Sequence, residues 1–232
     1  MERQIAPKFR ILSYSGEPFL DRMEAGILLA AALNEYRGQN AVVVGIPRGG
    51  MIVAREIARA LSADLDMIIA HKLRTPGHGE LAMGSISERG DLFLNQEVLT
   101  EAGVSDREIE QEKIIQKAEI QRRMRMFRAV KPKIPLKGRI VIVTDDGVAT
   151  GATTQSAIKA VLAEKPKKLI LAVPVGSEDT LRELATDVDE LVCLKSPNYL
   201  TAVGQVYRNF EAVTDEEVLE ILKNYREKED LA

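Results

Sequence analysis

The chain has 232 residues, of which 45% are hydrophobic and 4% aromatic, and its net charge at pH 7 is −3. This length suits a single domain with a substantial core, and the charge and the few aromatic residues argue against a nucleic-acid partner. The N-terminus lacks the apolar segment of a signal peptide, no apolar run is long enough to span a bilayer, and the single Cys193 excludes an internal disulfide. We therefore expect a cytoplasmic protein that has no membrane partner.

The first sixty residues predict two helices and one strand. Residues 1–18 are mixed in character and are expected to drape over the body of the domain. Residues 20–36 predict a helix that is apolar over much of its circumference and is therefore expected to be covered on most sides. A short apolar strand at 41–46 leads to a second helix at 51–61.

Between that strand and the second helix lies the sequence Pro47-Arg48-Gly49-Gly50. Two glycines at the end of a strand allow the backbone to fold closely around an anion, with the Arg48 guanidinium beside it. An ordinary tight turn between a strand and a helix would explain the same residues. The motif alone leaves both interpretations open.

A third strand is predicted at 65–70, followed by Lys72 and Arg74 and then by a segment rich in helix and strand breakers, 75–85. A loop of this length is uncommon unless it has a function, so we expect a mobile loop that carries His78 and Glu80. Lys72 is a candidate anion ligand, although a solvated strand end would look the same. His71 and His78 lack neighbours at metal-ligand spacing, so no zinc site is predicted. A small sheet extension is predicted at 86–97.

A long charged helix is predicted at about 105–130. Ser105 and Glu108 form a capping box, and acids early in the helix and arginines late in it suit the helix dipole. We expect this inserted helix to pack across the domain or in a subunit interface.

The most informative stretch is 139–156, RIVIVTDDGVATGATTQS. Its apolar start predicts a strand buried on both faces of a parallel sheet, and Asp145 and Asp146 follow directly at the carboxyl end of that strand. A loop of small residues then leads into a helix, whose first N–H groups and threonine hydroxyls can bind a phosphate. The two carboxylates can accept hydrogen bonds from sugar hydroxyls or help to hold a hydrated Mg²⁺. A sugar phosphate is thus the predicted ligand, against the alternative of an unrelated turn with an incidental acidic pair.

The remaining elements alternate in type: helix 155–164, strand 168–173, helix 178–185 and strand 190–194. An irregular segment at 195–210 follows, and Thr214 with Glu217 caps a last helix. This alternation predicts an α/β fold with a mainly parallel sheet flanked by helices.

The stretch IVIVTDDGVATGATT resembles the phosphoribosyl-diphosphate (PRPP) motif of the type I phosphoribosyltransferases, and Arg48-Gly49-Gly50 is similar to the pyrophosphate loop of that family. The resemblance covers about residues 20–210. It implies one domain with a core at about 20–195, a small hood from about 1–18 and 195–232, and the inserted helix.

The resemblance also implies which residues bind each part of PRPP. The 5′-phosphate would lie on Ala149, Thr150, Gly151, Ala152, Thr153 and Thr154. The leaving pyrophosphate would lie on Arg48, Gly49, Gly50, Lys72 and Arg74, beneath the mobile loop. Asp145 and Asp146 would hold the ribose hydroxyls, and Tyr199 or Leu200 is nearest to the position of an acceptor-stacking residue. The peptide between Arg48 and Gly49 corresponds to one that the family often holds cis.

The implied reaction is Mg²⁺-dependent displacement of pyrophosphate from PRPP by a nitrogen nucleophile of a nucleobase or related small molecule. Arg48, Lys72, Asp145 and Asp146 would be the catalytic residues. Mg²⁺ would be held mainly by PRPP, with the two aspartates acting through water, and a homodimer is expected.

The chain departs from the 6-oxopurine salvage enzymes at Ala149, where those enzymes carry an acid. An acceptor that needs no such base, or one served by Glu80, fits better. A PRPP-binding regulator of the same fold is the competing interpretation. A kinase-like nucleotide binder ranks last because the chain has no P-loop.

Overall fold

The structure is a computed structural model that describes residues 8–225, except for the side chains of residues 79 and 80. Its strands are β1 (Lys8–Ser13), β2 (Val42–Gly45), β3 (Asp64–Met67), β4 (Ala70–Thr75), β5 (His78–Ser87), β6 (Leu92–Leu94), β7 (Ile140–Thr144), β8 (Lys168–Val175) and β9 (Glu190–Lys195). Its helices are α1 (Arg22–Ala32), α2 (Gly50–Leu61), α3 (Gln96–Glu101), α4 (Asp106–Arg128), α5 (Ala152–Leu162), α6 (Glu178–Ala185) and α7 (Asp215–Asn224), with 3₁₀ turns η1 (Asn34–Tyr36) and η2 (Val203–Val206).

The body of the molecule is a six-stranded sheet in the order β1-β9-β8-β7-β2-β3, in which every pair is parallel. Alternate residues of its central strands enter two different cores: Val42 and Val44 of β2 lie in one, and Val43 lies in the other. Both faces of these strands are thus buried, which is why their sequences are continuous apolar runs. The predicted fold class is confirmed.

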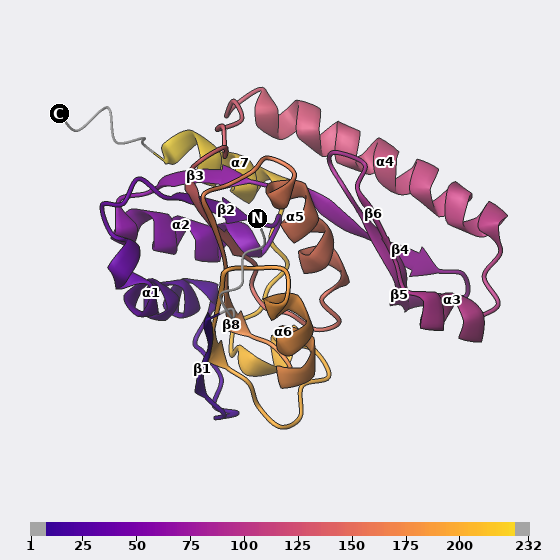
Figure 1. Cartoon of the computed structure of the whole chain (residues 1–232), viewed down its shortest axis with the longest axis horizontal. Coiled ribbons are helices and arrows are strands. Elements are labelled where there is room, and N and C mark those ends of the chain that lie inside the picture. The colour runs from indigo at the N-terminus through magenta and orange to yellow at the C-terminus, as the bar shows by residue number, and fades with distance from the viewer. Residues whose placement is uncertain (1–7, 226–232) are drawn as a thin grey trace, which may run out of the picture.

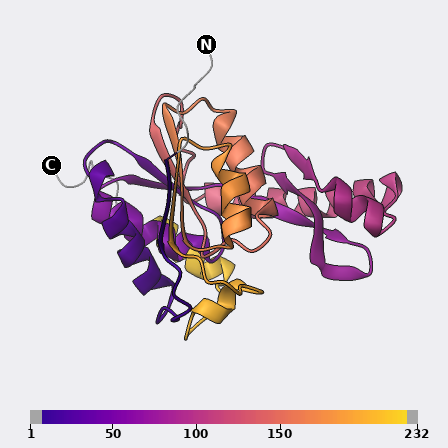
Figure 2. The same ribbon diagram turned by 60° about the horizontal axis from the view of Figure 1, so that its bottom comes forward.

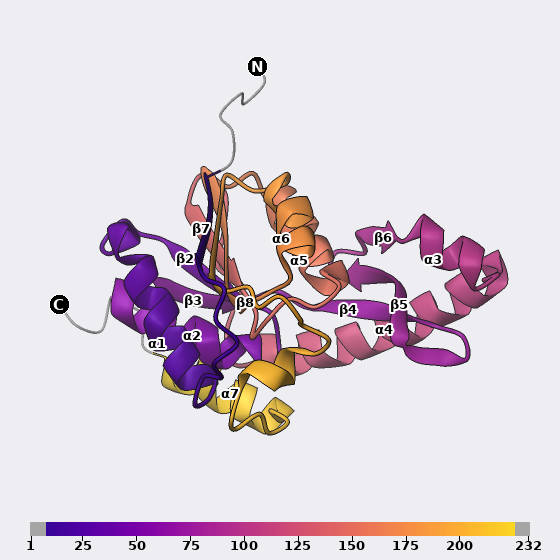
Figure 3. The ribbon, with the colours of Figure 1, turned by 90° about the horizontal axis from the view of Figure 1, so that it is seen from below.

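Helices cover both faces of this sheet (Figures 1 and 3). The core on one face is shared by α1, α2 and α7, and the core on the other face by α5 and α6. Among the described residues no helix is both long and apolar enough to cross a membrane.

Strands β2 and β7 are neighbours in the sheet, but the chain continues from them towards opposite edges. From β2 the chain passes through α2 to β3 at one edge, whereas from β7 it passes through α5, β8 and α6 towards the other edge. Adjacent strands whose helices leave in opposite directions open a crevice at their carboxyl ends, and open α/β sheets bind ligands there.

A second, antiparallel sheet of β4, β5 and β6 forms an arm with α3 and α4, which projects from one side of the body (Figures 1 and 2). A loop was expected at 75–85, but β4 and β5 form a hairpin there, with register shifts between Leu73 and Thr75. Gly77, with φ of +75°, closes its two-residue turn. At Gly84 a Cβ would lie 2.2 Å from the Phe93 carbonyl oxygen of the neighbouring strand β6. Gly77 and Gly84 therefore serve the hairpin itself.

Two further parts of the chain differ from prediction. Residues 8–13 form the edge strand β1, paired with β9, instead of draping over the body, and residues 1–7 lie outside the described part. Helix α1 is not covered on most sides, since Met23, Ile27 and Leu28 are 47%, 55% and 46% exposed. The predicted capping boxes of α4 and α7 are both present.

Candidate functional site

The two sequence motifs meet at the crevice between β2 and β7. Gly45 at the end of β2 is paired with Thr144 at the end of β7, and the Ile46 N–H donates to the Thr144 carbonyl oxygen at 2.9 Å. The Arg48-Gly49-Gly50 turn and the Asp145-Asp146 pair therefore start side by side, although almost a hundred residues separate them in the sequence.

Gly49 and Gly50 are needed for this close approach. A Cβ on Gly49 would lie 1.9 Å from Asp146 Oδ2, and a Cβ on Gly50 would lie 2.8 Å from the Asp145 Cα. Both distances are far inside van der Waals contact, so a side chain at Gly49 would displace the Asp146 carboxylate, and one at Gly50 would displace the backbone of Asp145. This packing explains the two glycines independently of any anion.

Arg22, in the first turn of α1, joins the site although the sequence motifs did not include it. Its Nε donates to Asp146 Oδ2 at 2.7 Å and its Nη1 donates to the Glu211 carbonyl oxygen at 2.9 Å. Its guanidinium carbon lies 3.8 Å from the centre of the Phe210 ring. The helix dipole disfavours a cation in the first turn of a helix. The position of Arg22 at the start of α1 was therefore the one local sign in the sequence that this side chain has a partner elsewhere.

Burial raises the pKa of both aspartates. Burial is the main cause that raises the pKa of Asp145, and the charge of Asp146 raises it further, against the opposing effects of the Asp146 and Gly50 N–H groups and of Arg22. Burial likewise raises the pKa of Asp146, and Arg22 opposes it. Two carboxyl groups held at raised pKa beside a crevice are a sign of a functional site, because a cation or sugar hydroxyls would stabilise their charge.

Glycines precede the two helices that leave this crevice. The N-termini of α1, α3, α4, α6 and α7 are capped by the side chain of the preceding Asp, Asn, Ser or Thr, whereas Gly49 and Gly151 give α2 and α5 no such cap. The Asp145 carboxylate lies at the start of α2 and accepts from the Gly50 N–H. The first backbone bond of α5 runs from the Gln155 N–H to the Gly151 carbonyl oxygen, so the N–H groups of residues 152–154 point out of the helix end. This end of α5 is suited to an anion.

The loop before α5 is held at its start by two hydrogen bonds. The Val148 N–H donates to the Val175 carbonyl oxygen at 2.8 Å, and the Thr180 hydroxyl donates to the Ala149 carbonyl oxygen at 3.1 Å. Gly151 has φ of +75°, a conformation that favours glycine. Along the predicted phosphate loop, Ala149 and Thr150 are exposed, Gly151 and Ala152 are buried, Thr153 is half-buried and Thr154 is buried. The loop thus has a set shape and an open outer side.

Arg48 lies at the start of α2 near a cluster of charges. Its Nη1 is 3.9 Å from Asp215 Oδ1, and Asp215 also accepts from Arg122 Nη2 at 2.7 Å and lies 3.6 Å from Arg123 Nε. Three arginines thus surround one carboxylate at the point where the α2 turn, α4 and α7 meet. Long-range contacts of this kind leave no local trace in the sequence.

The other predicted anion ligands lie on the arm. Lys72 is half-buried and Arg74 is exposed, both on β4. The hairpin is linked to the phosphate loop, since the Ser85 hydroxyl donates to the Ala152 carbonyl oxygen at 2.6 Å and lies 2.5 Å from the Ser156 hydroxyl. His78 is exposed at the start of β5, and the side chain of Glu80 lies outside the described part of the chain.

The segment after β9 comes back to the acidic loop. A Cβ on Gly147 would lie 2.5 Å from Val203 Cγ1, and the Tyr207 hydroxyl donates to the Asp146 carbonyl oxygen at 2.6 Å. Leu200 is half-buried against the core, whereas Tyr199 is 91% exposed. Val203 and Tyr207 thus touch the site loop, while Tyr199 lies on the surface.

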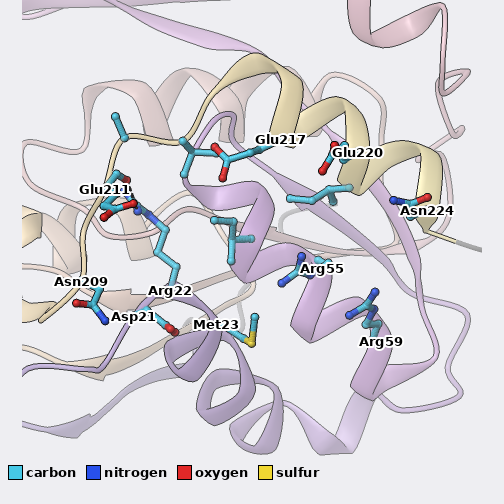
Figure 4. Close-up of a pocket in the computed structure, with 14 residues that line it drawn as sticks. Asp21, Arg22, Met23, Arg55, Arg59, Asn209, Glu211, Glu217, Glu220 and Asn224 are labelled. Carbon is cyan, nitrogen blue, oxygen red and sulfur yellow. Dashed lines mark hydrogen bonds between the residues drawn. The ribbon is translucent and has the colours of Figure 1, made fainter.

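A cavity of about 450 Å³ lies behind Arg22, between the start of α1, α2 and α7 (Figure 4). Arg55 and Arg59 of α2 lie opposite Glu217 and Glu220 of α7 across it. Arg22 lines this cavity and also contacts Asp146, so it separates the cavity from the acidic loop.

One expected backbone feature occurs one residue earlier than predicted. The cis peptide bond joins Pro47 to Arg48, not Arg48 to Gly49.

Comparisons with known proteins agree with this geometry. Residues 20–206 match the model of the phosphoribosyl transferase domain. Relatives from two strains of Mycobacterium tuberculosis, "Putative phosphoribosyl transferase MT0597" and "Putative phosphoribosyl transferase Rv0571c", are each 42% identical over 204 residues, which is 88% of this chain and 46% of theirs. The chain thus spans about half the length of these curated relatives.

A solved structure covers nearly the same extent. The crystal structure of TT1426 from Thermus thermophilus is 40% identical, with a TM-score of 0.74, over 89% of this chain and 98% of that one. The family match includes both loops of the crevice and the strands that hold them. The chain therefore belongs to the phosphoribosyl transferase domain family.

Proposed function

We propose that the chain transfers the 5-phosphoribosyl group of PRPP to a nitrogen nucleophile of a nucleobase or related small molecule, with release of pyrophosphate. The observation that carries the proposal is the junction of β2 and β7, where a half-buried acidic pair lies between the Arg48 turn and the open N-terminus of α5. PRPP offers one group for each of these features. Its diphosphate would meet the Arg48 turn, its vicinal ribose hydroxyls the acidic pair, and its 5′-phosphate the N-terminus of α5. Membership of the family supports the same assignment.

The end of α5 is the proposed site of the 5′-phosphate. The N–H groups of residues 152–154 and the hydroxyls of Thr150, Thr153 and Thr154 supply donors, and the helix dipole favours the negative charge. Asp145 and Asp146 lie next to this loop and would accept hydrogen bonds from the ribose hydroxyls. Arg22 already occupies Asp146 Oδ2, so it holds that carboxylate in one orientation.

The diphosphate is proposed to lie on the other side of the acidic pair. Arg48 and the turn at Gly49-Gly50 lie at the start of α2, and Lys72 and Arg74 extend from β4 of the arm. The bond between C1 of the ribose and the diphosphate oxygen breaks as the bond from C1 to nitrogen forms. The leaving group keeps the electron pair, so cations beside it lower the barrier more than they strengthen ground-state binding.

The donor set also fits a Mg²⁺ ion that arrives with its substrate. Residues 8–225 contain no group of three or more acidic, histidine or cysteine side chains that could hold a metal by themselves, within the described side chains. Mg²⁺ in such sites is bound by one or two carboxylates together with substrate phosphates, and its charge would balance the diphosphate. Asp145 and Asp146, acting through water, are the proposed protein ligands.

The acceptor is proposed to enter next to Val203, which lies against Gly147 of the acidic loop; Leu200, half-buried against the core, and the exposed Tyr199 come just before it in the chain. Ala149 supplies no base at the phosphate loop. A nucleophile that loses its proton to solvent, or to Glu80 or His78 if the arm closes, is therefore favoured over a 6-oxopurine.

A combined binding and turnover screen tests the proposal. PRPP with Mg²⁺ should raise the melting temperature, because a ligand that binds only the native state stabilises it by RT ln(1 + [L]/Kd). Pyrophosphate release should follow when the correct base or amine is added. The Asp145→Asn/Asp146→Asn double variant is the control, and it should remain folded but lose both effects.

The outcomes separate the alternatives. No thermal shift at millimolar PRPP, in folded protein, would remove the assignment altogether. Saturable PRPP binding without turnover across a wide acceptor panel would identify a PRPP-binding regulator instead.

A further inference from the structure

The carboxylate of Asp215, at the start of α7, has cationic partners from two other parts of the chain. Arg122 Nη2 of α4 lies 2.7 Å from Asp215 Oδ2, and Arg123 Nε of α4 lies 3.6 Å from Oδ1. Arg48 Nη1 lies 3.9 Å from Oδ1. Thr214 caps α7, and the helix dipole favours a carboxylate in this first turn. Asp215 is therefore held by α4 and by its own helix, and Arg48 is its most distant partner.

The charges of this cluster balance without Arg48. Glu119 of α4 accepts two hydrogen bonds of 2.8 Å from Arg122, and its Oε1 lies 2.9 Å from Arg123 Nε. Arg122 and Arg123 thus match two carboxylates, those of Glu119 and Asp215. Arg48 is the surplus cation of the cluster.

Two other acids occupy the first turn of α7, but they are not partners of Arg48. Glu217 points back to the helix cap, where its Oε2 accepts from the Thr214 N–H at 2.7 Å. Glu216 is exposed, and within residues 8–225 it forms no ion pair. Among the described side chains, Asp215 is the one carboxylate within 4.0 Å of the Arg48 guanidinium.

The contact between Arg48 and Asp215 is an ion pair without a hydrogen bond. Asp215 Oδ1, which faces Arg48, is buried and accepts no hydrogen bond from the described residues, whereas Oδ2 accepts from Arg122. The Asp215 side chain is 13% exposed and the Arg48 side chain is 41% exposed. A buried acceptor without a donor is costly, so Oδ1 attracts the nearest exposed cation, which is Arg48.

We propose that Asp215 is a positioning residue that competes with the diphosphate for Arg48. In the free protein Asp215 draws the Arg48 guanidinium towards α7, and a diphosphate at the Gly49-Gly50 turn draws it back. This inference rests on the proposed function, because it takes the diphosphate site as given. Arg122 and Arg123 still balance the cluster when Arg48 leaves, so the exchange strands no buried charge. Helix α4 thereby sets the affinity for the diphosphate without touching it.

Calorimetric titration with pyrophosphate and Mg²⁺ at 0.15 M salt, as a flagged working value of about one Debye length of 8 Å, tests the competition. Asp215→Asn removes the competing charge and keeps the shape of the side chain. It should tighten pyrophosphate binding by about 3-fold to 5-fold, the upper part of the range for an exposed ion pair. Glu216→Gln removes the same charge from the next residue of α7, and this matched control should change the dissociation constant by less than about 2-fold.

A double-mutant cycle separates competition for Arg48 from general repulsion of the ligand. Arg48→Ala should weaken pyrophosphate binding, and in that background Asp215→Asn should have no more effect than Glu216→Gln. Arg122→Ala tests the same idea with Asp215 intact. It removes the closest cation of Asp215, so Asp215 should hold Arg48 more strongly and binding should weaken by about 3-fold. This loss should also vanish when Arg48 is replaced by alanine.

The outcomes distinguish this inference from the function on which it rests. A folded wild-type protein that does not bind pyrophosphate at millimolar concentration would remove the proposed diphosphate site, and the role of Asp215 with it. If the wild type binds, an Asp215→Asn protein with unchanged or weaker affinity, or a gain that persists in Arg48→Ala, would overturn the role of Asp215 alone. Should Asp215→Asn fail to fold, the cycle of Arg122→Ala with Arg48→Ala decides, and additive losses in it would overturn the role.

Discussion

At the scale of single residues, the site is a set of close contacts between two distant motifs. Gly49 has no side chain because Asp146 and Arg22 occupy the space, and Asp145 accepts the N–H of Gly50 at the start of α2. The acidic pair and the glycine turn therefore act as one unit, and a change in either one should disturb the other.

Gly49→Ala should destabilise the protein. The added Cβ would lie 1.9 Å from Asp146 Oδ2, and overpacking of this kind typically costs about 1–3 kcal/mol. Denaturant unfolding measures the change in the free energy of unfolding. The control is Gly16→Ala, where a Cβ meets nothing within 4 Å, and it should be neutral or slightly stabilising. Equal stability of both variants would show that the Asp146 carboxylate moves aside at no cost.

Asp145→Asn should alter how stability depends on pH. In the folded protein the pKa of Asp145 is raised well above its ordinary value of 3.8, so the folded state holds a proton that the unfolded state has lost. The contribution of Asp145 to stability is therefore fully present below pH 3.8 and declines as the pH rises through the raised pKa. The difference in melting temperature between the variant and the wild type should become more positive from about pH 4 to pH 7.

Thermal melts of both proteins, each without ligand and at matched ionic strength, measure this difference. A difference that stays constant over the range, or that becomes more negative, would mean that Asp145 is ionised at no cost in the folded protein.

Sequence reasoning identified the acidic pair, the phosphate loop and the glycine turn because each is a local run of residues with a recognisable chemistry. It missed Arg22, whose partners Asp146 and Glu211 are more than a hundred residues away. The Asp215 cluster was missed for the same reason, since its three arginines come from the α2 turn and from α4. Local patterns predict which groups are present, but the partner of a long side chain depends on the tertiary fold.

At the scale of elements, the parallel sheet, the long helix α4 and the small sheet extension at β6 were predictable, and the hairpin of β4 and β5 was not. Strands β2, β7, β8 and β9 are continuous apolar runs between helices, so their type and order follow from the sequence. In the arm, the glycines of 75–85 indicated a loop, although Gly77 closes a turn and Gly84 lets β6 approach. The pairing of β4 with β5 depends on the packing of the arm against α4 and α5, which no local pattern encodes.

Ser85→Ala should loosen the link between the arm and the phosphate loop. The buried Ser85 hydroxyl contacts the Ala152 carbonyl oxygen and the Ser156 hydroxyl, and leaving such buried groups without a partner costs about 1–3 kcal/mol. Urea unfolding checks this value. Thr150→Ala removes an exposed hydroxyl of the same loop and should change stability by less than about 0.5 kcal/mol. A neutral Ser85→Ala would show that the arm and α5 are held together by apolar packing alone.

At the scale of the whole molecule, the topology of the sheet determines where a ligand can bind. The change of direction between β2 and β7 brings the start of α2, the acidic pair and the start of α5 to one edge. The cavity between α2 and α7 lies on the other side of Arg22 and is built from helix surfaces and from the segment 209–213. The central claim is that PRPP binds at the sheet edge and not in that cavity.

Amide chemical shifts of the labelled protein, recorded as PRPP and Mg²⁺ are added, test this claim most directly. Residues 49–50 and 145–154 should show the largest saturable shifts, because the ligand would contact their N–H groups. Saturable shifts confined to the cavity, at 52–59 and 217–224, would contradict the claim, and so would the absence of any shift at saturating PRPP.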